Sequence, residues 1–331
     1  MDSTIVDVNR KVCVTGAAGF LASWLIKRLL LSGYYVIGTV RDPNDDKRVG
    51  HLLKLEGAKE RLKLTSGDLM VEGSFDNAIM GCCGVFHTAS PVLGLPTSDP
   101  KAEILQPAID GTLNVLRSCK KNPFLRRVVL TSSSLTIRVK DDFDPSIPLD
   151  EFSWSSEELC ERLQIWYVLS KTLAEQAAWK FCKENKIDLV TILPSFVIGP
   201  SLPPVLCSTA SDVLGLLKGE TKKFEWHGRM GYVHIDDVAV SHIMLYENEN
   251  ANGRYLCSSI VLDNDKLSLI LSTRYPTLPI PKRFQKLNRP YYELDVSKLK
   301  GLGMKFKSIE EMFDDTIESL TKQGHLRFVV D

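Results

Sequence analysis

The most informative stretch of this sequence is Val12-Cys13-Val14-Thr15-Gly16-Ala17-Ala18-Gly19-Phe20-Leu21-Ala22. Its apolar start predicts a buried strand, and the amphipathic pattern that follows predicts a helix. Gly16 permits the sharp turn between them, Gly19 allows close approach to the backbone, and Ala22 allows tight helix packing. The alternative is a plain strand–helix connection, but free N–H groups at Phe20 and Leu21 behind such a turn favour a site for the pyrophosphate of a dinucleotide.

Through the first 200 residues, short runs rich in β-branched residues alternate with helical patterns. The runs that we expect to be strands are 12–15, 35–40, 62–65, 84–87, 127–132 and 189–193. This alternation predicts an α/β fold with a doubly wound parallel sheet, the Rossmann architecture, whose ligands bind at the carboxyl ends of the strands. After Pro200 the elements become shorter, and a helix is expected near 310–321. We therefore expect residues 1–200 to be mainly a dinucleotide-binding domain and 201–331 mainly a smaller substrate lobe, with some strands returning to the first domain.

Composition excludes several classes of protein. The 331 residues are 44% hydrophobic and 25% charged, as in ordinary globular proteins, and 41 basic side chains balance 41 acidic ones, so we expect no nucleic-acid partner. The best apolar segment, 20–31, is interrupted by Lys27 and Arg28 and is too short to span a bilayer, so no membrane span is expected. Residues 1–10 lack the pattern of a secretory signal, and the eight cysteines lack CxxC spacing. We therefore expect no metal site and a cytoplasmic location.

The end of the second predicted strand indicates which dinucleotide binds. An acidic residue there would bind a ribose 2′-hydroxyl, whereas Arg41, roughly 20 residues past the glycine turn, can neutralise a 2′-phosphate. The sequence therefore predicts NADPH/NADP+ as the cofactor. Arg48 is either a second contact to that phosphate or part of a solvated helix face.

A second motif, in the segment 166–175, predicts acid–base chemistry. Tyr167 and Lys171 lie four residues apart on a strongly helical segment and therefore on one face. An adjacent ammonium would lower the phenol pKa from about 10 and make proton transfer possible at neutral pH. Ser133, at the hydroxyl-rich end of the strand 127–132, could donate a hydrogen bond to a carbonyl oxygen. The alternative is a chance spacing with a packed ring and a solvated amine.

Several segments together make the sequence similar to a known family. They are 15–19, 39–43, 67–69, 85–91, 131–133, 166–171 and 194–200. Through them the chain resembles the extended short-chain dehydrogenase/reductases, in particular the plant group similar to dihydroflavonol and cinnamoyl-CoA reductases. The resemblance implies that Ser133, Tyr167 and Lys171 form a catalytic triad and that Lys171 also binds the nicotinamide ribose. The cofactor contacts that it implies are Asp68 and Leu69 at the adenine, Thr88, Ala89 and Ser90 along the cleft, and Pro194, Ser195, Phe196 and Val197 against the nicotinamide.

Departures from the family pattern narrow the range of substrates that the resemblance implies. Cinnamoyl-CoA reductases usually carry Asn and Cys around the Trp-Tyr pair, where this chain has Ile165 and Val168, and dihydroflavonol reductases carry Asn at the position of Arg138. The segments 75–81, 202–220 and 231–237 are more similar to plant tetraketide α-pyrone reductases, which implies reduction of a side-chain ketone on a pyrone precursor of sporopollenin. The run 166–171 also resembles that of cinnamyl-alcohol dehydrogenases. Reduction of hydroxycinnamaldehydes is therefore the alternative activity.

The remaining candidates concern the substrate pocket and other function classes. Arg138, Ser208 and Trp226 are candidates for the wall of an apolar pocket that takes a small-molecule carbonyl substrate. His87 and His234 are expected to be structural, because the Tyr–Lys pair already supplies the proton. A non-catalytic dinucleotide sensor would need neither a catalytic serine nor a tyrosine, and a nucleotide-sugar epimerase would have little use for NADPH.

Overall fold

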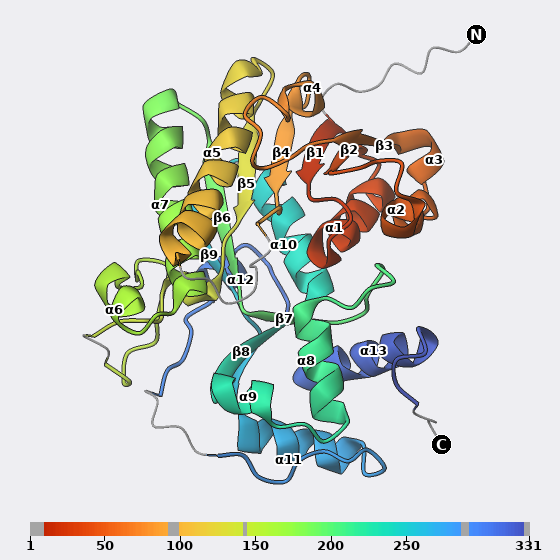
Figure 1. Cartoon of the computed structure of the whole chain (residues 1–331), viewed down its shortest axis with the longest axis vertical. Helices are drawn as coiled ribbons and strands as arrows, with labels where there is room; N and C mark the ends of the chain where they lie inside the picture. The colour runs from red at the N-terminus through yellow and green to blue at the C-terminus, as the bar shows by residue number, and fades with distance from the viewer. Residues whose placement is uncertain (1–9, 92–98, 142–143, 286–290, 328–331) are drawn as a thin grey trace.

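The β-branched runs of the first 200 residues pair into one sheet. The computed structural model describes residues 10–91, 99–141, 144–285 and 291–327. Its main sheet is parallel, with the strand order β3-β2-β1-β4-β5-β6-β9 (Figure 1). The strands are β1 (Lys11–Thr15), β2 (Tyr35–Val40), β3 (Leu62–Ser66), β4 (Gly84–His87), β5 (Arg127–Thr131), β6 (Leu189–Pro194) and β9 (Gly253–Cys257). The predicted doubly wound parallel sheet is confirmed, and the six strands expected within it end within one residue of their predicted bounds.

Both faces of this sheet are buried, because successive strand residues point to opposite sides. On β5, Val128 and Leu130 pack with α5 (Gln106–Lys121) and α7 (Trp166–Asn185), whereas Val129 packs on the side of α1 (Phe20–Leu31) and α10 (Ile235–Glu247). Figure 1 shows α5 and α7 together on one side of the sheet and α1 and α10 on the other. This layering leaves the carboxyl ends of the strands as the edge where a ligand can reach the backbone.

A smaller sheet follows the main one along the chain. Strand β7 (Phe196–Ile198) runs parallel to β8 (Arg229–His234), and β10 (Ile260–Asp263) runs antiparallel to β8. The helices that surround it in the lower part of Figure 1 are α8 (Ser208–Leu217), α9 (Lys222–His227), α11 (Asn264–Arg274) and α13 (Ile309–Lys322). Their apolar side chains form a separate core around Tyr232 and Phe313.

The two sheets are joined closely at one place. A single residue, Ser195, separates β6 of the main sheet from β7 of the smaller one, and Ser258 and Ser259 separate β9 from β10. Strand β9 lies far beyond residue 200 but pairs with β6 in the main sheet. The carboxyl ends of β6 and β9 therefore lead directly into the smaller sheet.

The other elements are short. They are α2 (Asp46–Leu53), α3 (Ala58–Arg61), α4 (Asp76–Ile79), α6 (Glu157–Arg162), α12 (Ser297–Gly301), the π-helical turn η2 (Lys101–Leu105) and the 3₁₀ turn η3 (Ser134–Thr136). Within the described ranges, no helix combines the length and apolar character that crossing a bilayer requires. The eight cysteines are free thiols, seven of them buried.

Candidate active site

The glycine turn lies at the carboxyl end of β1, against the end of β2. Gly16 has a φ of +68°, and a Cβ there would lie 3.1 Å from the Cα of Ala89. The amide of Ala17 donates a hydrogen bond to the carbonyl of Thr39 over 2.8 Å. Gly19 is the N-cap of α1 and has no side chain to cap it, and the first turn of this helix carries no acidic residue. An open helix N-terminus of this kind fits the pyrophosphate of a dinucleotide.

The residues that open α1 are those named for the pyrophosphate. Phe20 and Leu21 are half-buried, with side chains packed against the core between α1 and the sheet. Their side chains anchor the helix, so only the backbone of this first turn faces the edge of the sheet. The structure thus brings Gly16, Gly19 and the start of α1 together as the sequence predicts.

A buried threonine organises the segment that follows β4. The hydroxyl oxygen of Thr15 accepts hydrogen bonds from the amides of Thr88 and Ala89, each over 3.1 Å, and lies 2.8 Å from Nδ1 of His87. Because both amides donate to this oxygen, the hydroxyl proton points to the imidazole. Burial lowers the pKa of His87 to about 3, so the ring is neutral and structural. Thr88 and Ala89 are half-buried beside the glycine turn, and Ser90 is exposed.

The two arginines named for the 2′-phosphate are in different situations. Arg41 follows β2 directly and is exposed, and its guanidinium makes no hydrogen bond or ion pair with any residue that the structure describes. Arg48 lies on α2, where its guanidinium is 3.3 Å from the carboxylate of Asp45. Arg41 is thus available to an anion at the end of β2, whereas Arg48 already has a partner.

The residues named for the adenine lie just beyond β3. The carboxylate of Asp68 accepts a hydrogen bond from the amide of Met70 over 2.8 Å, and the Asp68 carbonyl accepts one from the hydroxyl of Ser74 over 2.7 Å. The carbonyl of Leu69 accepts from the side chain of Asn114 over 2.8 Å. These bonds fix a tight turn at the outer end of the sheet, on the same edge as the glycine turn.

Ser133 follows β5 and caps the turn η3. Its Oγ accepts a hydrogen bond from the amide of Leu135 over 3.2 Å, and its carbonyl accepts one from the amide of Thr136 over 3.0 Å. The Ser133 hydroxyl proton is therefore available for another acceptor. This is the arrangement that donation to a substrate oxygen requires.

Tyr167 and Lys171 both lie near the start of α7, which packs against η3. Tyr167 exposes 40% of its surface. Desolvation by the surrounding protein raises the pKa of Tyr167, and burial lowers that of Lys171 to about 8. The expected lowering of the phenol pKa by the ammonium is absent, because the loss of water around the phenol dominates. Lys171 makes no hydrogen bond or ion pair within the described part of the chain.

One small cavity lies beside Lys171 and beside Ser132, which directly precedes Ser133. It is lined by Ala89, Ser90, Ala108, Thr112, Leu130, Thr131, Ser132, Lys171, Ala174 and Glu175. The cavity joins the segment after β4, the end of β5 and the inner face of α7. Ala89 and Ser90, named for the cofactor, therefore line the same cavity as Lys171, named for both cofactor binding and catalysis.

The residues named for the nicotinamide lie at the junction between the two sheets. Pro194 ends β6, and the amide of Ser195 donates to the carbonyl of Cys257 over 3.0 Å. Phe196 packs edge-on against Tyr232, with ring centroids 5.9 Å apart. Val197 is half-buried against the main core. The side chains of Phe196 and Val197 give this junction an apolar surface, which suits a nicotinamide ring.

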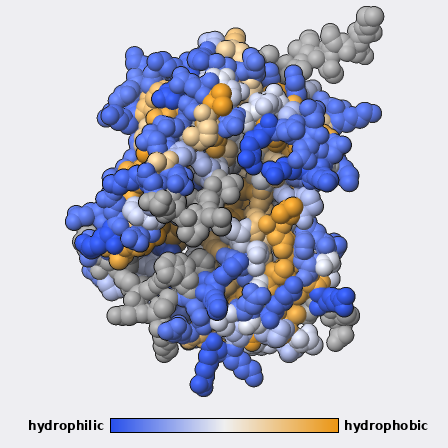
Figure 2. Space-filling view, viewed as in Figure 1, coloured by the Kyte–Doolittle hydropathy of each residue, from blue (hydrophilic) through white to orange (hydrophobic). Residues whose placement is uncertain are grey.

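The substrate candidates are dispersed. Ser208 is exposed at the start of α8, and the guanidinium of Arg138, just after η3, donates to the hydroxyl of Tyr292 over 2.7 Å. The side chain of Trp226 lies outside the described residues. Figure 2 shows this face hollowed between its upper and lower halves, with apolar side chains on the lower wall next to α8. Val205, just before α8, is 78% exposed.

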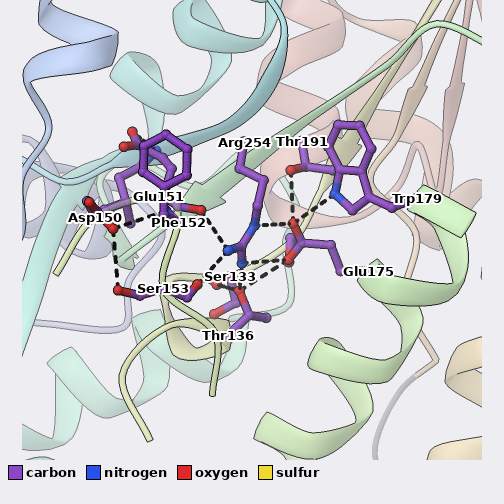
Figure 3. A network of polar contacts seen from close by, with 12 residues as sticks. Ser133, Thr136, Asp150, Glu151, Phe152, Ser153, Glu175, Trp179, Thr191 and Arg254 are labelled. Atoms are coloured by element: carbon purple, nitrogen blue, oxygen red, sulfur yellow. Dashed lines mark hydrogen bonds and ion pairs between the residues drawn. The ribbon is translucent and has the colours of Figure 1, made fainter. Parts of the chain in front are cut away.

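One polar group behind Ser133 was not predicted from the sequence. Glu175 and Arg254 form an ion pair of 2.8 Å, and both are buried (Figure 3). The spacing of Glu175, four residues after Lys171, is a signal for the carboxylate. Arg254 is 79 residues away from it along the chain, so no local pattern could reveal the pair.

The fold, the glycine turn, the cation after β2 and the Ser–Tyr–Lys group define a dinucleotide-dependent oxidoreductase. Comparison with known proteins agrees: residues 12–257 match the NAD dependent epimerase/dehydratase family, and the chain belongs to this family. The predicted class of enzyme is thereby confirmed.

Individual relatives are similar over nearly their whole length. The chain is 72% identical to tetraketide alpha-pyrone reductase 1 of Arabidopsis thaliana, over 97% of this chain and 98% of that protein. Vestitone reductase from alfalfa has a similar structure, with a TM-score of 0.83, 36% identity, and 96% and 99% of the two chains covered. The yeast methylglyoxal/isovaleraldehyde reductase complexed with NADPH has a TM-score of 0.81, 28% identity and coverage of 96% and 100%. These similarities agree with the predicted resemblance to plant reductases and with the predicted cofactor.

Proposed function

We propose that this protein is an NADPH-dependent reductase that converts the side-chain carbonyl of a tetraketide α-pyrone, a precursor of sporopollenin, to an alcohol. The observation that carries the proposed chemistry is that Ser132 and Lys171 line one small cavity at the carboxyl edge of the sheet, with Ser133 directly after Ser132 and Tyr167 one turn before the lysine. The 72% identity to the Arabidopsis pyrone reductase supports the proposed substrate.

Each member of the triad has a distinct role in the proposed reaction. The nicotinamide, when bound, supplies the hydride that reaches the carbonyl carbon. Ser133 donates a hydrogen bond to the carbonyl oxygen and stabilises its developing negative charge. Tyr167 donates its proton to that oxygen, and its raised pKa keeps the phenol protonated at neutral pH, as reduction requires. Lys171 is charged below pH of about 8 and, being unpaired among the described residues, is available to bind a ribose hydroxyl.

The proposed cofactor contacts follow the edge of the sheet. The glycine turn and the first turn of α1 hold the pyrophosphate, Arg41 holds the 2′-phosphate, and Asp68 and Leu69 lie at the adenine. The wall at the junction of β6 and β7 faces the nicotinamide. We therefore also propose that residues 1–200 mainly bind the cofactor and 201–331 mainly bind the substrate. A cytoplasmic location is part of the proposal and is supported by the free thiols.

Arg138 is the proposed contact to the pyrone ring. A tetraketide that closes to an α-pyrone keeps an enol hydroxyl, which is a vinylogous carboxylic acid and therefore an anion at neutral pH. Arg138 is half-buried, five residues after Ser133, and has no carboxylate partner among the described residues. A desolvated guanidinium without a counter-ion favours an anionic ligand. Tyr292 holds this guanidinium through a hydrogen bond of 2.7 Å.

Reduction of hydroxycinnamaldehydes is the alternative function, because the run 166–171 is shared with enzymes of that activity. It needs the same triad but no cation for an acidic ring. A substrate panel separates the two: NADPH oxidation is followed with a tetraketide pyrone, coniferaldehyde, a dihydroflavonol and a cinnamoyl thioester. We expect the highest kcat/KM with the pyrone.

The tyrosine variant Tyr167→Phe tests the mechanism in the same assay. We expect a loss in kcat of about 10²- to 10⁴-fold, the scale of general acid catalysis, with nearly unchanged NADPH affinity. Full turnover in this variant would contradict the assigned role of the phenol. NADPH binding without turnover of any carbonyl would favour the dinucleotide sensor.

A further inference from the structure

A buried ion pair lies behind the turn that carries Ser133. Side-chain exposure is 1% for Glu175 in α7 and 7% for Arg254 in β9. Arg254 Nε lies 2.8 Å from one carboxylate oxygen and Nη2 lies 3.3 Å from the other. Removing both charges from water is costly, and well-packed apolar side chains often stabilise a fold as well as such a pair does. Stability alone therefore does not explain the pair, so its other contacts must be considered.

The carboxylate of Glu175 holds both ends of the turn around Ser133. The hydroxyl of Ser132 donates to Oε2 over 2.6 Å, and Oγ1 of Thr136 lies 3.1 Å from the same oxygen (Figure 3). Ser132 directly precedes Ser133, and Thr136 closes η3. Oγ1 of Thr136 also lies 2.9 Å from the carbonyl of Ser133, so its single proton is shared between the two acceptors. The carboxylate thus fixes the backbone on each side of the proposed catalytic hydroxyl.

Arg254 extends this support to a second segment. Its Nη2 donates to Oγ1 of Thr136 over 2.8 Å, and its Nη1 donates to the carbonyls of Glu151 and Ser153 over 2.9 and 2.6 Å. The guanidinium also lies 3.6 Å from the ring centroid of Trp154. Only the planar fork of an arginine can make these contacts together with a bidentate contact to a carboxylate.

Glu175 also acts on the proposed catalytic lysine. It lies one helical turn after Lys171, and both side chains line the same cavity. Burial lowers the pKa of Lys171, and the negative charge of Glu175 partly opposes that effect. The other titratable groups near the ammonium are Tyr167 on α7 and His87 on β4, both neutral around pH 7. Glu175 is therefore a charged group that raises the pKa of this lysine against the effect of burial.

We propose that the Glu175–Arg254 ion pair is a positioning element for carbonyl reduction, which orients the hydroxyl of Ser133 through Ser132 and Thr136 and places a carboxylate one helical turn from Lys171. The pair acts through Ser132, Thr136 and Lys171. The inference rests on the proposed function, because the pair acts through residues of the proposed triad.

The variant Glu175→Gln removes the charge with almost no change in shape. We expect kcat to fall about 10- to 100-fold, the scale of hydrogen bonds to charged groups, with NADPH affinity within about twofold of wild type. We also expect the alkaline loss of kcat to begin at lower pH, because removing the carboxylate charge lowers the pKa of Lys171. If the ion pair were purely structural, Glu175→Gln would lower thermal stability but would not change the pH at which kcat begins to fall.

A matched control is the ion pair at the opposite edge of the sheet. Arg127 at the start of β5 has a side chain only 7% exposed, and its guanidinium lies 2.9 Å from the carboxylate of Asp188. The variant Asp188→Asn breaks a pair that is far from the carboxyl edge and has one buried member, since the Asp188 side chain is 47% exposed. This variant should lower thermal stability and leave unchanged both kcat and the pH at which kcat begins to fall. Equal effects of the two variants on kcat would overturn the proposal.

A double-mutant cycle with Ser133→Ala separates this inference from the proposed function. At about pH 6, where Lys171 is charged in every variant, Glu175→Gln should lower kcat less than about threefold in the Ser133→Ala background, because the two residues act as a unit. An equal loss in both backgrounds contradicts the positioning role. Full turnover in Ser133→Ala alone would instead contradict the assigned role of Ser133.

A paired apolar variant covers the case in which the single variant does not fold. Glu175→Met with Arg254→Met keeps the volume and removes the cost of burying two charges, which offsets part of the loss of their hydrogen bonds to Ser132, Thr136 and Glu151, so we expect a folded protein of somewhat lower thermal stability. Turnover should stay at least about tenfold below wild type, because the turn loses its acceptor. Wild-type turnover, or loss of folding in this variant as well as in Glu175→Gln, would show that the pair is only structural.

Discussion

Lys171 loses its proton at lower pH than Tyr167, one turn before it in α7. Burial lowers the pKa of the ammonium to about 8, and desolvation raises that of the phenol above its ordinary value of 10. In the free enzyme the phenol therefore stays protonated throughout the neutral range. The charge of the lysine is the property that changes first as the pH rises.

This order predicts how activity depends on pH. Reduction should be constant around pH 7 and fall as the pH rises through about 8, because Lys171 then loses the charge that binds the ribose. The kcat/KM for NADPH, measured from pH 6 to 10, checks this. A decline that begins only near the ordinary lysine pKa of 10.5 would contradict the assignment.

Arg41 should determine the preference for NADPH over NADH. Its guanidinium is exposed and unpaired among the described residues, so Arg41→Asp should raise the KM for NADPH about 10- to 100-fold, the scale of a lost charge-assisted contact. The KM for NADH should change little. Arg48→Ala is the matched control, because Arg48 is engaged with Asp45. Equal losses for both cofactors in Arg41→Asp would refute the assignment.

Gly16 should not tolerate a side chain. Its φ of +68° disfavours other residues by about 1 to 2 kcal/mol, and a Cβ would lie 3.1 Å from Ala89. Gly16→Ala should therefore lower both the free energy of unfolding and NADPH affinity. The control Gly50→Ala lies in α2 with nothing within 4 Å of the new atom, and it should stabilise the protein by up to about 1 kcal/mol. Denaturant titration and cofactor fluorescence measure the two effects.

Arg138 should discriminate between charged and neutral pyrones. We expect Arg138→Gln to raise the KM for the acidic pyrone about tenfold, the loss of one charge-assisted contact. The O-methyl ether of the pyrone carries no ring charge. We therefore expect wild type to bind it as weakly as Arg138→Gln binds the acidic pyrone, and the substitution should not raise the KM for the ether further. Tyr292→Phe removes the hydroxyl that holds the guanidinium and should have a smaller effect. An identical loss for both pyrones in Arg138→Gln would show that the contact does not depend on the ring charge.

Buried histidines should make the fold sensitive to acid. Burial lowers the pKa of His87 to about 3 and that of His234 and His242 to about 4, below the ordinary value of 6.5. The unfolded chain therefore binds more protons than the native one below pH 6.5, so stability is full above that pH and falls as the pH falls toward 4. Each histidine should contribute a loss of about 1.4 kcal/mol per pH unit. Thermal unfolding from pH 7 to 5 measures it, and His242→Gln should reduce the slope.

Local patterns were sufficient for the main sheet. A strand of β-branched residues and a glycine turn are determined by neighbours along the chain, so β1 to β6 and the start of α1 could be predicted. The same holds for Tyr167 and Lys171, because a helix places residues four apart on one face. Strand β9 could not be assigned to this sheet from the sequence, because its partner β6 is distant along the chain.

The sequence by itself determined the class of fold, the family and the residue types of the site, since these depend on periodicity and short motifs. Only the tertiary structure decided the electrostatics: burial reversed the expected shift in the pKa of Tyr167, and Arg41 and Arg48 proved to differ in their partners. It also brought Arg254 from β9 onto Glu175 behind Ser133. Desolvation and contacts between distant segments arise only once the chain has packed, so no local pattern in the sequence predicts them.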